Sequence, residues 1–87
     1  MPRKPRIEMI GYHHVLNRGV NKQAIFLDAQ DNQMFLQILC QSCKEYQVEV
    51  HSYCLVDNHY HLLIKTADEN LSKFMRSLNS SYAIYFN

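Results

Sequence analysis

The spacing of hydrophobic residues changes twice along this chain and limits the folds it can adopt. Between residues 34 and 46 they recur every three or four positions, which predicts a helix capped by Asp28. From Val48 to Thr66 apolar and polar residues alternate around the turn-forming pair Asp57-Asn58, which predicts a β-hairpin. From Leu71 the helical spacing returns, so we expect a second helix that runs to the end of the chain.

A further strand is predicted before the first helix. The run Tyr12–Asn17 mixes aromatic and β-branched residues and ends at a glycine turn, Arg18-Gly19. With the hairpin strands at 48–56 and 59–66, the order is strand, helix, strand, strand, helix. This order indicates an α+β, ferredoxin-like fold, an antiparallel sheet with two helices on one face that lacks its last strand (β-α-β-β-α).

Length and composition agree with one small domain over residues 1–87. The content of 47% hydrophobic and 20% charged residues is that of a folded globular protein. The second helix meets no stop signal before Asn87, so we expect a C-terminally truncated domain. No apolar run reaches the roughly 18 residues of a membrane span. Since the three cysteines are an odd number, they form no disulfide framework, and we expect a cytoplasmic protein with no membrane partner.

The motif His59-Tyr60-His61 carries the most chemical information. Residues at i and i+2 of a strand point to the same face, so both imidazoles lie together while Tyr60 points toward the helices. Two imidazoles can hold a divalent metal, although histidines at this spacing also occur on exposed strands without one. With oxygen ligands from DNA or water they suit Mg²⁺ or Mn²⁺, whereas Zn²⁺ would favour an added thiolate.

Cys54 is the candidate for that thiolate. A two-residue turn places Cys54 opposite His61, on the metal face, and places His51 on the face of Tyr60. We interpret Cys54 as a small packed side chain, because free cysteine is usually buried. His51 is not expected to be a ligand.

Four other candidates have structural interpretations. His13 and His14 point to opposite faces of their strand, so at most one can approach the histidine pair. Cys40 and Cys43 lie on the first predicted helix with no second cysteine pair to complete a zinc site, and we interpret them as packing residues.

The basic residues are concentrated near the N-terminus. The formal net charge of +1 is too small for a protein that coats nucleic acid. Five basic residues nevertheless precede the first acidic cluster, with only Glu8 among them: Arg3, Lys4, Arg6, Arg18 and Lys22. This distribution is compatible with a local phosphate contact.

The chain resembles the single-tyrosine HUH transposases, and the REP-associated tyrosine transposases in particular, in the stretches CLVDNHYHLLIKT, MPRKPRIEMIGYHHVLNRGVNKQAIF and LSKFMRSLNSSYAIYFN. The resemblance covers essentially the whole chain. It implies a nuclease domain that cuts and rejoins single-stranded DNA beside hairpins through a 5′-phosphotyrosine, with His59 and His61 holding a divalent metal. It also implies DNA contacts for Arg3, Lys4 and Arg6, which form a basic N-terminal arm, and for the turn at Arg18.

Two departures from the family pattern matter. The family usually has methionine-proline-asparagine before the first ligand histidine, whereas this chain has Val56-Asp57-Asn58, which we expect to loosen the turn. The family's nucleophilic tyrosine follows the fourth strand, whereas Tyr82 and Tyr85 match an earlier helix and continue its apolar stripe. We therefore expect no catalytic tyrosine in this chain, with Tyr82 and Tyr85 as weak candidates only.

Three functions stay open from the sequence. The first is a transposase-type enzyme that keeps the metal ligands but lacks the nucleophile. The second is a non-catalytic remnant that binds single-stranded or hairpin DNA, and the third is a structural zinc or interaction module. An unfinished sheet offers unpaired backbone groups to another chain, so we also expect a homodimer.

Overall fold

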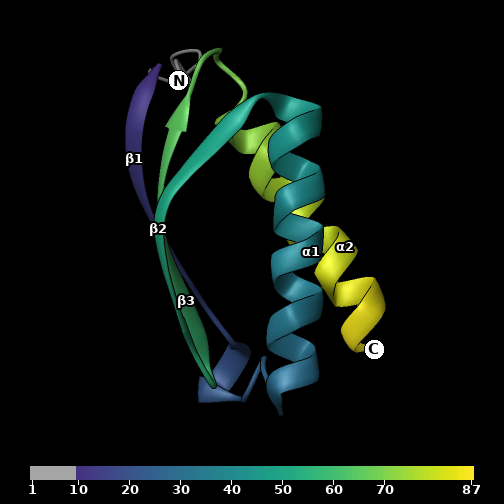
Figure 1. Ribbon diagram of the computed structural model, residues 1–87. Coiled ribbons are helices and arrows are strands. Elements are labelled where there is room, and N and C mark those ends of the chain that lie inside the picture. Colours follow the sequence, from purple (N-terminus) through teal and green to yellow (C-terminus); the bar gives the residue numbers. More distant parts are fainter. Residues whose placement is uncertain (1–9) are drawn as a thin grey trace, which may run out of the picture.

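The computed structural model describes residues 10–87 as a three-stranded sheet with two helices on one of its faces (Figure 1). In chain order the elements are β1 (Gly11–Arg18), a 3₁₀ turn η1 (Val20–Lys22), α1 (Ala29–Tyr46), β2 (Val48–Val56), β3 (His59–Thr66) and α2 (Leu71–Phe86). The predicted α+β, ferredoxin-like arrangement is therefore confirmed. Within residues 10–87, neither helix is long and apolar enough to cross a membrane.

β3 is the central strand of the sheet. The strand order is β1-β3-β2, and β3 runs antiparallel to both neighbours. Its register places Arg18 of β1 opposite His59, and Cys54 of β2 opposite His61. The predicted hairpin register is confirmed, and residues from three strands meet around the histidine pair.

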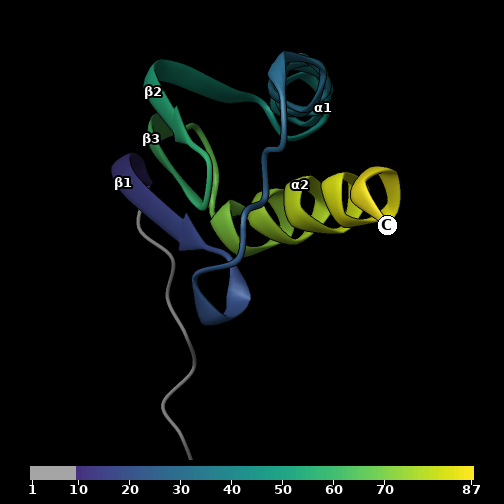
Figure 2. The ribbon, with the colours of Figure 1, turned by 90° about the horizontal axis from the view of Figure 1, so that it is seen from below.

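The core lies between β3 and the two helices. Tyr60, Leu62 and Ile64 alternate along β3 toward this side, and each is at most 2% exposed. The ring of Phe35 on α1 packs against Tyr60 with centroids 4.7 Å apart, and Phe74 of α2 joins the same cluster. Both helices lie on this side of the sheet, as Figure 2 shows with α1 seen end-on and α2 from the side, so we call it the inner face and the opposite one the outer face.

The two helices begin differently. Asp28 caps α1, because its carboxylate accepts a hydrogen bond from the Asp31 amide at 3.0 Å, as predicted. No side-chain cap begins α2, since Asn70 makes no such bond to its own helix. Its side-chain amide donates instead to the carbonyl of Tyr46. Asn70 thus joins the end of α1 to the start of α2.

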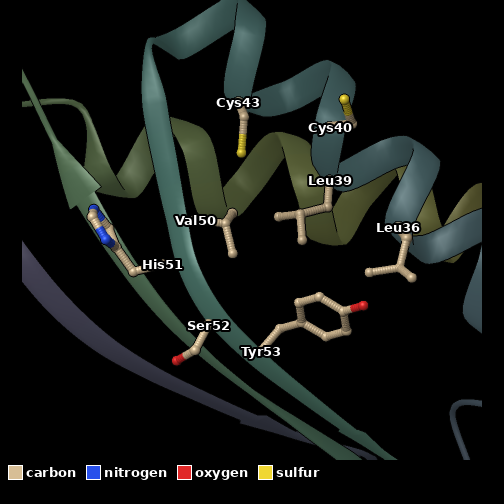
Figure 3. Close-up of a pocket in the computed structure, with 8 residues that line it drawn as sticks. All are labelled: Leu36, Leu39, Cys40, Cys43, Val50, His51, Ser52 and Tyr53. Atoms are coloured by element: carbon tan, nitrogen blue, oxygen red, sulfur yellow. The ribbon is translucent and has the colours of Figure 1, made fainter.

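Strict alternation along β2 was a wrong prediction. A β-bulge lies between Val50 and Ser52, and the extra residue, His51, has no partner on β3. Val50 and Tyr53 therefore both point toward α1, while His51 and Ser52 point away from it (Figure 3). His51 lies on the outer face, not on the face of Tyr60.

A cavity of about 570 Å³ lies between α1 and β2. Leu36, Leu39 and Tyr53 contribute to its wall, and it is on the inner side of β2 (Figure 3). Cys43 packs against the core beside it, and burial together with nearby Cys40 raises the pKa of the Cys43 thiol to about 11. Cys40 is exposed, so its interpretation as a packing residue was wrong.

Candidate metal and nucleic-acid site

His59 and His61 lie side by side on the outer face. Their ring centroids are 5.1 Å apart and their planes meet at 82°. Both side chains are half-buried. Because imidazole nitrogens bind a metal at about 2.0–2.1 Å, two rings at this separation can reach one ion.

Each ring has a neighbour that can fix its orientation. The Nδ1 of His59 lies 2.7 Å from the side-chain oxygen of Asn58, so a proton on Nδ1 would be donated to that oxygen and Nε2 would be left as the ligand. His61 stacks on His14 with centroids 5.3 Å apart, and its Nδ1 lies 3.4 Å from the Nε2 of His14. His14 is thus the one histidine of β1 that approaches the pair, whereas His13 reaches Thr66 at 3.3 Å on the inner face.

The charges around His61 favour its neutral form. Desolvation lowers the pKa of His61, and the nearby charges of His59, His14 and Arg18 lower it further. Since only the unprotonated nitrogen of an imidazole can bind a metal, this shift assists a ligand role.

Arg18 and Lys22 lie beside the first histidine. Together with Gly19, Asn58 and His59 they line a cavity of about 200 Å³. Of the five basic residues singled out in the sequence, the structure brings these two to the candidate site. Arg3, Lys4 and Arg6 lie outside the described residues.

The turn after β1 depends on Gly19. A Cβ atom at this position would lie 2.2 Å from the carbonyl oxygen of Gln23, so only glycine fits without a shift of the backbone. The Gly19 amide donates to the carbonyl of Asn58 at 2.9 Å. The amides of Ile25 and Phe26 donate to the carbonyl of Asp57 at 2.6 and 3.0 Å. These bonds tie the β2–β3 turn to the segment that carries Lys22.

The donor set fits an open metal site better than a closed one. In the part of the chain that the structure describes, no group of three His, Cys, Asp or Glu side chains is placed to hold a metal. Cys54 is exposed opposite His61, so its interpretation as a packed side chain was wrong. Two imidazoles with free positions for oxygen ligands are typical of catalytic ions, whereas structural zinc sites take four protein ligands.

Tyr82 and Tyr85 lie on α2 and point toward α1 and the segment before it. The hydroxyl of Tyr82 donates to the carbonyl of Ile25 at 2.5 Å, and that of Tyr85 donates to Asp31 at 2.7 Å. Burial raises the pKa of Tyr82 above its usual range, and the hydrogen bond to Asp31 is the main cause that raises the pKa of Tyr85 to about 12. Tyr82 is buried in the core, as its helical spacing predicted.

Comparison with known proteins identifies the family. Residues 7–87 match the family model of IS200-like transposases. The chain belongs to this transposase family, as the sequence resemblance predicted. Its fold is similar to that of a solved REP-associated tyrosine transposase bound to a REP hairpin, with a TM-score of 0.74 at 13% identity. That match covers 98% of this chain and 53% of the solved one, so the chain spans about half the length of this relative. A comparison with curated proteins gave no match.

Proposed function

We propose that this domain binds single-stranded or hairpin DNA on its outer face and places one phosphate at a divalent ion held by His59 and His61. The domain would serve a transposase that cuts and rejoins DNA through a 5′-phosphotyrosine. The observation that carries the proposal is the pair of imidazoles on the central strand, with Arg18 and Lys22 beside them. Membership of the transposase family supports DNA as the substrate.

The residues around the pair have separate roles in this proposal. A bound Mg²⁺ or Mn²⁺ would polarise the scissile phosphate and offset the charge that develops on its oxygens. Asn58 orients His59, and His14 supports His61. Arg18 and Lys22 bind neighbouring phosphates, which positions the strand without reading its sequence.

We further propose that neither Tyr82 nor Tyr85 attacks the phosphate. A tyrosine nucleophile must lose its proton, and a raised pKa makes that loss harder. Both hydroxyls also donate hydrogen bonds within the inner layer, to Ile25 and to Asp31. The attacking tyrosine would then be a residue other than these two.

Electrophoresis with a labelled single-stranded DNA hairpin tests the proposal. We expect Mn²⁺ or Mg²⁺ to strengthen the shift in a native gel, and we expect the double variant His59→Ala/His61→Ala to lose this metal effect. Lys73→Gln, which changes an exposed side chain of α2 away from the outer face, is the control and should keep it. No binding with either metal would overturn the proposal.

A denaturing gel of the same reactions tests the nucleophile. We expect no covalent protein–DNA band from this chain. A covalent band that Tyr82→Phe or Tyr85→Phe removes would show that the inner tyrosines do serve. DNA binding that no metal changes would favour the non-catalytic remnant instead.

A homodimer remains part of the proposal. β1 and β2 form the two edges of the described sheet, and edge strands can pair with another chain. Sedimentation at rising protein concentration should show association. A monomer at the highest concentration would contradict it.

A further inference from the structure

The outer face carries a second cluster of side chains, at the opposite end of the sheet from the β2–β3 turn. Its centre is Tyr12 of β1, which is 63% exposed. The Nζ of Lys65 lies 5.6 Å from the centroid of the Tyr12 ring. The ring of His51 meets the same ring edge-on, with centroids 5.1 Å apart. We call these three residues the Tyr12 cluster.

The bulge in β2 builds this cluster. Counted back from Cys54, which pairs with His61 on the outer face, strict alternation would place His51 on the inner face. The extra residue turns His51 outward, where it meets Tyr12. Bulges commonly aim a side chain near a functional site. The exposed tyrosine is therefore held by neighbours from both of the other strands.

The charges of the outer face suit a nucleic acid. Its cationic side chains are Arg18 at one end and Lys65 at the other, on registers that share the face with His59 and His61. Glu49 is the acidic residue on the same face, opposite Lys65, and its carboxylate lies 3.5 Å from the Nε2 of His51. Because Glu49 partly offsets Lys65, the aromatic ring is the main anchor that this end can offer.

The cluster lies within reach of the proposed metal site along one strand. Lys65 follows His61 by four residues on β3, which corresponds to about 13 Å at the rise of a strand. His14, which stacks on His61, follows Tyr12 by two residues on β1 and shares its face. A DNA single strand that runs from the histidine pair along β3 would thus meet the Tyr12 ring.

We infer that the Tyr12 cluster is a stacking subsite for one base of the single-stranded DNA whose phosphate lies at His59 and His61. This inference rests on the proposed function and adds the path that the DNA strand takes across the sheet. Aromatic side chains on an exposed sheet stack bases with little sequence preference, because every base has a π-face. Lys65 would bind the adjoining phosphate. Tyr82, by contrast, is buried and offers no such platform.

Fluorescence provides a direct test, because the chain contains no tryptophan. The variant Tyr12→Trp introduces a single reporter at the proposed platform. Titration with oligo(dT), with EDTA present so that no metal is bound, should quench its emission if a base stacks on it. A blunt duplex of equal length should leave the emission unchanged. Quenching should persist in Tyr12→Trp combined with His59→Ala/His61→Ala.

Affinity measurements supply the second test. We expect Tyr12→Ala to weaken oligo(dT) binding by about tenfold, and Tyr12→Phe to bind as the wild type does. Circular dichroism should show all variants folded, since Tyr12 is exposed. If oligo(dT) binds with unchanged affinity to Tyr12→Ala and leaves the reporter emission unchanged, the subsite is wrong and the proposed function stands. If the wild type binds no single strand, the proposed function itself fails.

Discussion

The two faces of strand β3 use alternate residues of one short sequence for opposite purposes. Tyr60, Leu62 and Ile64 point inward and are almost fully buried under the two helices. His59 and His61 alternate with these residues and so point to the outer face, which neither helix of residues 10–87 covers (Figure 2). The inner residues contribute stability through buried apolar area, whereas the outer residues contribute little to it.

This separation means that the outer face can change its chemistry without altering the fold. Positions that alternate on a strand share a backbone but not an environment, so a core strand can present two metal ligands at fixed spacing. The rigidity of the buried side holds the spacing of the exposed side. Variants on the inner face should therefore change mainly the stability of the fold, and variants on the outer face should change mainly the binding of metal and DNA.

The largest effect is expected from Leu62→Ala on the inner face. Removing a fully buried leucine side chain leaves a cavity and should lower the free energy of unfolding by about 2–5 kcal/mol. His61→Ala, one position earlier on the same strand, should lower it by less than about 1 kcal/mol. Urea titration monitored by circular dichroism measures both. Equal losses would show that the two faces are not separate in this way.

Asn58→Ala sharpens the comparison by changing a residue that only orients a ligand. Without the side-chain oxygen 2.7 Å from Nδ1, the ring of His59 loses its partner. We expect Mn²⁺ affinity in the DNA complex to fall by about 10–100-fold, as for other outer partners of metal-bound histidines. Affinity equal to that of the Lys73→Gln control would show that Asn58 does not position the ring.

Alkaline pH should lower the free energy of unfolding through Tyr60, a residue of the inner face. Burial raises the pKa of Tyr60 to about 12 from its usual 10. Its contribution to stability is therefore complete below pH 10 and is lost as the pH rises toward 12. Between about pH 9 and about pH 11 we expect a loss of about 1 kcal/mol in urea titrations. Tyr60→Phe should lack this part of the loss, and an identical pH profile would contradict the assignment.

The smallest effect is expected from Arg18→Gln on the outer face. If Arg18 binds one phosphate, the variant should weaken single-strand binding a few-fold and reduce the slope of log affinity against log salt by about 0.7. Lys73→Gln, which removes the charge of an exposed side chain on α2, is the matched control. Equal slopes in the two variants would remove Arg18 from the DNA contact.

Local patterns in the sequence were sufficient for the element order and for the histidine pair. The change from helical to alternating spacing gave the order, and the turn at Asp57-Asn58 gave the register that places Cys54 opposite His61. The approach of His14 to the pair also followed from strand alternation, as one of two choices. These features depend on near neighbours along the chain.

The predictions that were wrong depend on interactions between parts of the chain that are distant in the sequence. The bulge at His51 depends on how β2 packs against both β3 and α1, and the outward position of His51 changed with it. Cys54 is apolar by type, but neither α1 nor α2 covers the face on which it lies. The η1 turn and the role of Asn58 depend on contacts between segments about forty residues apart, such as the bond from the Gly19 amide to Asn58.

The most direct test of the proposed metal site counts Mn²⁺ ions in the complex of this protein with a single-stranded DNA hairpin, by electron paramagnetic resonance. The hairpin alone is the background. We expect one additional ion per chain for the wild type and for Lys73→Gln. We expect none for His59→Ala/His61→Ala, which should still fold and still bind the hairpin. An additional ion that persists in the double variant would contradict the site at His59 and His61.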